Sequence, residues 1–356
     1  MTEEITNNDQ VRPYDYRKSN RKRFLFTVGL LGLTIFIVFF DLYMTTSGYM
    51  SIDEFFKALF WPDQAYFINV IIVRDLQAPI SILGILCGAT FGFAGAVMQT
   101  MLNNPLASPY TLGISSGATL GAALAIAGGL GGLSIVGMYL IPAAAFIFAM
   151  ITCAFIFIVA KRRKFNATIL ILAGVGVVQL FTAIQSVLQY FVNSDTLRDI
   201  AFWTMGSLEK ATWKIDALIL VLFVIGFVVL YSKSWLLTAM RLGDNKARSM
   251  GINVEKLRKW MFLLISVLTA GAVSFVGAIG FIGIVAPHMA RMVVGEDQRY
   301  LLVTSALLGA VVLECADIAS KCITVGIVYP IGTITAIIGL PVYFALLMRK
   351  KGGGFE

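Results

Sequence analysis

Five uncharged polar side chains recur at three- and four-residue spacing inside an otherwise apolar stretch of the sequence. They are Gln179, Thr182, Gln185, Ser186 and Gln189. In an α-helix this spacing places the five residues on one face. A polar face within an apolar helix needs protein or water beside it, because lipid offers no hydrogen-bond partner. The stripe therefore predicts either the wall of a pathway for a passing solute or hydrogen bonds between neighbouring helices.

Three charged residues lie close together near the end of another apolar stretch. Glu314 and Asp317 are followed by Lys321. Ionisable side chains deep inside a membrane-spanning segment are candidates for function, whereas the same residues at the membrane surface are ordinary. Both interpretations stay open at the level of sequence.

Residues for catalysis or tight metal binding are scarce. His288 is the only histidine, and no Gly-x-x-x-x-Gly-Lys phosphate loop occurs. The four cysteines lack metal-type pairing and fit small packing residues. We therefore expect no catalytic residue, no metal site and no cofactor in this chain, which we do not expect to be an enzyme. Any ATP hydrolysis would take place in a partner chain.

Composition indicates the elements that must carry these residues. The chain is 58% hydrophobic and 13% charged, with a mean hydropathy of +0.83, whereas soluble domains are about 25% charged. Crossing the hydrocarbon layer takes about 20 mostly apolar residues per helix. We therefore predict an all-α, polytopic membrane protein of about ten transmembrane helices. The expected spans are 24–43, 67–101, 112–127, 138–160, 167–192, 215–231, 260–281, 282–294, 301–318 and 331–348.

The placement of Lys and Arg predicts the orientation. Basic residues crowd into 12–23, 161–164, 241–259 and 349–351, which fall on one side if the N-terminus is cytoplasmic. We therefore expect both termini to lie in the cytoplasm. We expect the protein to lie in the cell membrane. The expected organisation is a tail at 1–23, a membrane domain at 24–349 and a tail at 350–356. The net charge is +8, and the basic residues cluster at the ends of the predicted helices. We therefore expect the lipid bilayer as a partner and expect no nucleic acid.

Two connections stand out from the predicted spans. Residues 232–259 are basic and amphipathic, with Gly243 and Gly251 as breaks. They predict either a short helix–turn–helix that docks a cytoplasmic partner or a solvated interfacial loop. Residues 103–109 contain two prolines, which a continuous helix does not accept, so a turn or a broken helix is expected there. Glycines at four-residue spacing, at 84, 88 and 92 and again at 113, 117 and 121, predict close helix packing.

Several sequence segments, in a fixed order from about residue 67 to the C-terminus, resemble a known family. The segments are Gly95-Ala96-Val97-Met98-Gln99, Asn104-Pro105-Leu106-Ala107, Leu112-Gly113-Ile114-Ser115-Ser116-Gly117-Ala118, Leu172-Ala173-Gly174-Val175, Phe202-Trp203-Thr204-Met205-Gly206-Ser207-Leu208, Gly277-Ala278-Ile279-Gly280-Phe281-Ile282-Gly283, Pro287-His288 with Arg291, Ala316-Asp317, Pro330-Ile331-Gly332-Thr333-Ile334-Thr335-Ala336 and Gly339-Leu340-Pro341. With them the chain resembles the FecCD-type permease subunits of ABC importers, which take up iron-siderophores, haem and cobalamin.

The resemblance implies a fold, partners and roles for residues. It implies a ten-helix protomer paired with a second permease, identical or different, around a central pathway lined by the 167–192 span. Two cytoplasmic ATPase subunits, which use the ATP, would dock on the coupling loop 232–259, and an extracellular substrate-binding protein would dock on the opposite side. The implied residues are Ala247, Met250 and Gly251 for ATPase coupling, and Asn104 and Leu106 for the inner gate.

The chain departs from the family pattern at its outer surface. The family usually has Arg-Leu-Pro-Arg where this sequence has Gln77-Ala78-Pro79-Ile80. Arg74 lies three residues earlier, and Lys321 stands where the family commonly has an arginine. We therefore expect Arg74 and Lys321 to dock the binding protein.

The expected function is that of a permease subunit that moves a ferric siderophore into the cell by alternating access. Haem and cobalamin are the alternatives within the family. A stand-alone secondary transporter would be expected to hold coupling ions with carboxylates near mid-membrane, and acidic residues are nearly absent from the centres of the spans. A membrane-embedded enzyme would need a catalytic cluster, and none is visible in the sequence.

Overall fold

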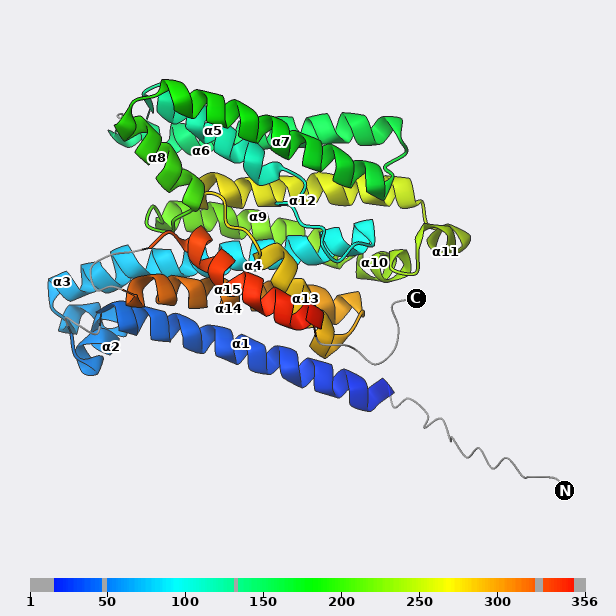
Figure 1. The fold of residues 1–356 in the computed structure, drawn as a ribbon. Coiled ribbons are helices and arrows are strands. Elements are labelled where there is room, and N and C mark those ends of the chain that lie inside the picture. The colour runs from blue at the N-terminus through cyan, green and yellow to red at the C-terminus, as the bar shows by residue number, and fades with distance from the viewer. Residues whose placement is uncertain (1–15, 47–49, 131–133, 324–328, 349–356) are drawn as a thin grey trace.

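A computed structural model describes residues 16–46, 50–130, 134–323 and 329–348, which are helical and without strands. Long helices lie side by side in a bundle, and short helices cap its ends (Figure 1). The long helices are α1 (Tyr16–Thr46), α4 (Ala78–Leu102), α5 (Ile114–Ala127), α6 (Ser134–Arg162), α7 (Ala167–Phe191), α9 (Trp213–Tyr231), α12 (Val254–Val276), α13 (Ile282–Val294), α14 (Gln298–Cys322) and α15 (Ile331–Met348).

Seven helices in the described ranges are long and apolar enough to cross a membrane. Three further apolar helices, Ile114–Ala127, Ile282–Val294 and Ile331–Pro341, are shorter. All ten expected spans overlap these helices, so the all-helical, multi-pass membrane protein is confirmed, while the count of ten crossings stays a prediction.

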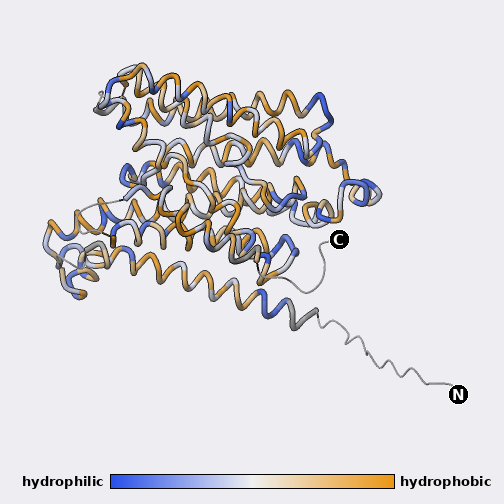
Figure 2. The backbone as a smooth tube through the Cα atoms, viewed as in Figure 1, coloured by the Kyte–Doolittle hydropathy of each residue, from blue (hydrophilic) through white to orange (hydrophobic). Residues whose placement is uncertain are grey.

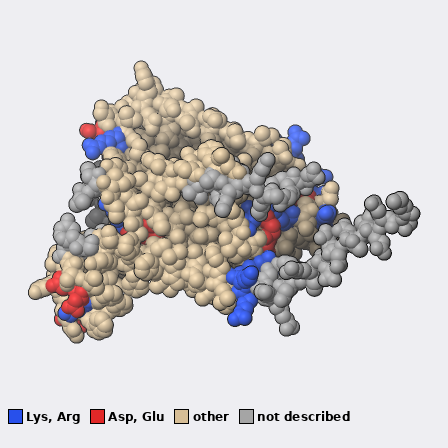
Figure 3. All heavy atoms as spheres, turned by 60° about the horizontal axis from the view of Figure 1, so that its bottom comes forward, with Lys and Arg blue, Asp and Glu red and all other residues tan. Residues whose placement is uncertain are grey.

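Figure 2 shows apolar residues along the helices and hydrophilic residues gathered at the two ends of the bundle. On the face in Figure 3, charged side chains likewise gather towards the two ends.

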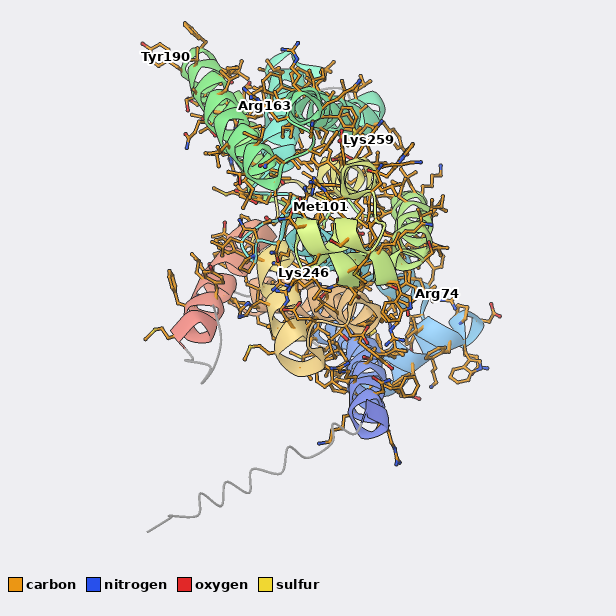
Figure 4. The ribbon with its side chains drawn as sticks, turned by 90° about the vertical axis from the view of Figure 1, so that its right-hand side faces the viewer. Arg74, Met101, Arg163, Tyr190, Lys246 and Lys259 are labelled. Carbon is orange, nitrogen blue, oxygen red and sulfur yellow. The ribbon has the colours of Figure 1, made fainter. Side chains whose placement is uncertain are left out.

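The two ends of the bundle carry different short helices. One end, called the α11 end here, has α10 (Ser234–Met240), α11 (Asp244–Ser249), the start of α1 and the end of α15. The opposite end, called the α2 end, has α2 (Ile52–Phe60), α3 (Phe67–Val70) and α8 (Ser194–Met205). Of the basic segments that sequence assigns to the cytoplasm, the described residues 16–23, 161–164 and 241–259 lie at the α11 end, where Arg163, Lys246 and Lys259 are labelled in Figure 4. The cytoplasmic position of this end stays a prediction.

The core of the bundle is α4, which is buried along nearly its whole length and packs most closely on α14. Glycines make this approach possible: a Cβ at Gly88 would lie 2.9 Å from the Cα of Ala310. Gly84 and Gly92 face α14 in the same way, at Glu314 and Ser305. The close packing predicted from these glycines is therefore confirmed.

The second glycine series has a mixed role. Gly117 and Gly121 bring α5 against the α6 backbone near Phe148 and Ala144, as predicted. Gly113 instead precedes α5 with a φ of +81°, in the left-handed region that glycine adopts without strain. Its role is to turn the chain into the helix.

Several boundaries differ from those expected. The span 260–281 is wrong at both ends: α12 is Val254–Val276, because Gly277 takes a φ of +75° and ends the helix. Helix α1 begins at Tyr16, so helical structure extends into the segment 1–23 predicted as a tail. Helices α2 and α8 were missed, because neither is long or apolar enough to resemble a span. The tail at 350–356 lies outside the described residues.

Candidate functional site

A cavity of about 470 Å³ opens along the polar face of α7. Four residues of the predicted stripe, Thr182, Gln185, Ser186 and Gln189, line it, while Gln179 is exposed on the same helix outside the lining. Other lining residues come from distant parts of the chain: Tyr110, Ser115, Ser116, Thr119, Thr204, Met205, Ala278, Gly280, Phe281, Gly332, Thr333 and Ala336. The tertiary structure thus adds polar groups of α5, α8 and α15 to the stripe.

The wall of this cavity is polar but carries no Asp, Glu, Lys, Arg or His among its lining residues. The hydroxyls of Thr182 and Ser186 donate to carbonyls one turn earlier on α7, at 2.8 and 2.9 Å. Gln185 Nε2 donates to Thr204 Oγ1 of α8 at 3.4 Å. Such a wall offers many weak hydrogen bonds and no fixed charge, so it can pass a large polar solute without holding it tightly.

Irregular backbone borders the same cavity. Between α12 and α13 the chain leaves the helical conformation over residues 277–281, and Phe281 takes a φ of 65°. Non-helical backbone at membrane depth is tolerated where it is buried in protein or lines a water-filled space. This segment and Tyr110 therefore belong to the site, although the periodicity of the spans gave no signal for them.

The connection 103–113 between α4 and α5 contains the predicted gate residues. Asn103 ends α4 in a left-handed conformation, with a φ of 46°. The side-chain oxygen of Asn104 accepts a hydrogen bond from the Leu106 N–H at 2.9 Å, and the Leu106 side chain is half exposed. The expected break at the two prolines is confirmed, whereas the role of these residues as a gate stays a prediction.

The connection 232–259 forms the expected pair of short helices, α10 and α11. Of the three predicted coupling residues, Ala247 is fully buried, while Met250 is 61% exposed. Gly251 has a φ of +81° and nothing within 4 Å of its Cβ position. The helix pair therefore presents an exposed turn at the surface. Its ATPase-coupling role stays a prediction.

Arg258 joins this helix pair to the core. The residue is only 2% exposed, and its guanidinium bonds Asp244 Oδ1 and Oδ2 of α11 at 2.8 and 3.1 Å. The same guanidinium donates to the carbonyls of Met101 at 2.9 Å and Phe165 at 2.8 Å. One side chain thus connects α11, the last turn of α4 and the α6–α7 connection; the position of Met101 is labelled in Figure 4.

A second ionic group connects the helix pair to α4 and α13. Arg241 donates to Asn103 Oδ1 at 2.7 Å and to both Glu296 oxygens at 3.1 Å. Glu296 also accepts from Arg291 at 3.1 Å, and Arg291 donates to Gln99 Oε1 at 2.9 Å. The chain of contacts therefore runs from the surface loop to α4 and α13. Next to it, hydrogen bonds from Arg299 hold the pKa of Asp297 below its usual value.

Buried charges also gather at the α2 end. Lys321 Nζ lies 3.0 Å from Asp41 Oδ1 and 2.5 Å from Asp317 Oδ2, and Ser81 donates to Asp41 at 2.5 Å. Glu314 lies beside them and is fully buried. Sequence pointed to three of these residues but missed Asp41, which α1 supplies. The three carboxylates lie within 4.8 Å of one another, and the Lys321 ammonium is the cation for two of them, Asp41 and Asp317.

The two predicted docking residues are both engaged inside the structure. Arg74 donates from Nε and Nη2 to the Leu59 carbonyl at 3.1 and 2.7 Å. Lys321 lines a pocket of about 480 Å³ at the α2 end, together with Gln77 and Glu209. The structure thus places both cations at the end predicted for docking, with Lys321 in internal ion pairs, and docking itself stays a prediction.

A family model described as the FecCD transport family matches residues 33–350. The chain belongs to this family. The resemblance expected from the sequence segments is therefore confirmed.

Two relatives show the range of transport systems in the family. The hemin transport system permease protein of Yersinia pestis is 33% identical over 281 residues, covering 78% of this chain and 83% of the relative. The iron(3+)-hydroxamate import system permease protein of Bacillus subtilis is 33% identical over 282 residues, covering 79% of this chain and 72% of the relative.

A solved structure has the same fold. It is described as an inward-facing conformation of a metal-chelate type ABC transporter, and it matches with a TM-score of 0.80 and 27% identity. The match covers 91% of this chain and 99% of the other. The chain therefore shares its overall helical fold with this transporter.

Proposed function

We propose that this chain is the membrane permease subunit of an ATP-binding-cassette importer, and that its cargo is a ferric siderophore. The observation that carries the proposal is the uncharged polar cavity along α7, in a chain of the FecCD transport family. Relatives named for iron hydroxamate, hemin and cobalamin import support this class of cargo. The wall supports a hydrophilic chelate in particular, because its hydroxyl and amide groups can exchange hydrogen bonds with the carbonyl and hydroxyl groups of a siderophore.

The mechanism is alternating access without covalent chemistry. A second permease, identical or different, completes the pathway opposite α7. An extracellular binding protein loaded with the chelate docks at the α2 end through Arg74 and Lys321. Two ATPase subunits dock at the α11 end on Ala247, Met250 and Gly251, and their closure on ATP moves this turn. The movement then opens the connection at Asn104 and Leu106, so that the chelate leaves into the cytoplasm.

Two other functions have less support. Haem and cobalamin are cargoes named for relatives of comparable identity, and the binding protein rather than the permease wall would select among them. A stand-alone secondary transporter needs ion ligands along its pathway, but the carboxylates at Asp41, Glu314 and Asp317 do not line the α7 cavity.

Uptake by cells tests the proposal directly. A strain lacking this gene, and other importers of iron chelates, is supplied with a panel of 55Fe-labelled siderophores, 55Fe-haem and labelled cobalamin. We expect uptake of one siderophore to return with the gene and to stop on ATP depletion. Return of haem or cobalamin uptake instead would replace the cargo within the same mechanism. Uptake that persists without ATP would contradict the importer class.

A further inference from the structure

A third cavity, of about 570 Å³, lies at the α11 end between α9, α10 and α12. Its lining is mostly aliphatic and continues to the turn at Met250 and Gly251. The polar lining residues are Lys233, Asn253 and Lys256, and no acidic residue is among them. The cavity therefore has an apolar surface next to two positively charged side chains. This combination matches an anionic amphiphile, which has an apolar chain and a negatively charged headgroup.

The two lysines are available to a ligand. Lys233 and Lys256 are exposed, and neither forms an ion pair within the described residues. They belong to two different segments, the junction of α9 with α10 and the first turn of α12, and both line the same cavity. Two converging ammonium groups without a carboxylate partner favour a negatively charged group between them.

The position of the cavity fits the boundary of a bilayer. It lies where α9 ends and α12 begins, two helices that are long and apolar enough to cross a membrane. The outward side chains of α9, among them Val224, Ile225 and Val228, are half exposed and apolar, as lipid-facing residues are. Trp260 lines the cavity and is 54% exposed, and tryptophan is enriched at the membrane–water boundary.

We propose that this cavity binds an anionic phospholipid, with an acyl chain along the apolar surface between α9 and α12 and the phosphate between Lys233 and Lys256. A zwitterionic lipid would leave the two cations without compensation, because its own cationic group opposes them. Basic pockets between helices on the cytoplasmic side commonly hold anionic headgroups. This lipid site goes beyond the proposed transport function and does not depend on the identity of the cargo.

Quenching of Trp260 by brominated lipids tests the site. The full chain is placed in nanodiscs containing a small fraction of dibromo-phosphatidylglycerol or dibromo-phosphatidylcholine. Subtracting the signal of the Trp260→Phe variant isolates Trp260 from the other tryptophans. We expect the glycerol lipid to half-quench Trp260 at a mole fraction lower by on the order of tenfold, since each lysine near an anionic surface adds about 1 kcal/mol.

Matched variants separate the site from general charge. Lys233→Gln with Lys256→Gln should abolish the preference, whereas Lys233→Arg with Lys256→Arg should keep it. Lys22→Gln with Lys161→Gln removes two exposed lysines that do not line the cavity, so the preference should persist. Equal quenching by the two lipids in the unchanged chain would overturn the proposal. So would a preference that survives in the Lys233/Lys256 glutamine variant.

Discussion

Asp244 and Arg258 are joined by two hydrogen bonds of 2.8 and 3.1 Å across the base of the α10–α11 pair. Asp244 begins α11, whereas Arg258 is buried in α12 and also holds the Met101 carbonyl at the end of α4. The proposed coupling turn and the start of the proposed inner gate therefore share one side chain. We therefore expect a movement of α11 to reach α4 through the Arg258 side chain.

Loss of the Asp244 carboxylate should uncouple ATP hydrolysis from transport. Its side chain is 39% exposed, so Asp244→Ala should leave the chain folded, while α11 loses its link to Arg258. In the transporter reconstituted with its partners, we expect ATPase activity to persist and uptake per ATP to fall severalfold. Glu255→Ala removes an exposed acid of the first turn of α12 as a control. An unchanged transport-to-ATP ratio in Asp244→Ala would exclude this route.

Replacement of Gly251 by a bulky residue should have a similar effect through the backbone. Gly251 has a φ of +81°, which costs a residue with a side chain about 1–2 kcal/mol. Gly251→Leu should therefore shift the exposed turn that we propose for the ATPase contact. Gly129→Leu is a matched control, because Gly129 has a φ of +82° and equally open space in a different connection. Normal uptake by Gly251→Leu at normal expression would remove the coupling assignment.

The contact between α4 and α14 should not tolerate one added methyl group. At Gly88 the new Cβ would meet the Gly309 carbonyl and lie 2.9 Å from Ala310 Cα, both on backbone that cannot yield locally. Overpacking of this kind costs about 1–3 kcal/mol. We expect Gly88→Ala to lower the melting temperature in detergent. Gly176→Ala, where nothing lies within 4 Å, should leave it unchanged; equal stability of the two variants would contradict the packing.

Lys321 should be essential for stability at the α2 end, independently of any docking. Lys321→Met would leave Asp41 and Asp317 buried without their cation, a loss that costs about 3–5 kcal/mol. Thermal unfolding of the chain without partners should show a large decrease, partly restored by adding Asp41→Asn. Lys214→Met is the control at an exposed lysine of the α9 start. If Lys321→Met unfolds like the unchanged chain, the ion pairs contribute little.

Arg74 should contribute to docking through its charge. Its guanidinium donates to the Leu59 carbonyl and remains partly exposed. Arg74→Glu should weaken binding of the substrate-binding protein by about tenfold at low salt, because it reverses the charge at the proposed contact, and the loss should shrink as salt screens the charge. Surface plasmon resonance on nanodiscs measures both the affinity and its dependence on salt. Arg198→Glu serves as a second charge reversal at the same end. Equal affinities for the Arg74→Glu and unchanged chains would rule out this contact.

Local patterns were enough for the helices and for part of the site. A span needs a long apolar run, and the polar face of α7 needs only the 3.6-residue period, so both are encoded within single segments. Four of the five stripe residues do line the cavity. The helices α2 and α8 were not predicted, because short amphipathic segments have neither a long apolar run nor a polar face within one. The end of α12 was not predicted, because Gly277 lies within a continuous apolar run.

The sequence by itself determined the apolar helices and the polar stripe, because each depends on residues that are neighbours along one helix. It also determined the family, because that depends on the order of segments along the chain and not on their contacts. Only the tertiary structure decided which distant residues meet. Asp41 of α1 pairs with Lys321 of α14, 280 residues away, and Arg258 bonds Met101, 157 residues away. The physical reason is that a buried charge must find its partner in space. The sequence pattern of one helix does not predict where another helix packs against it.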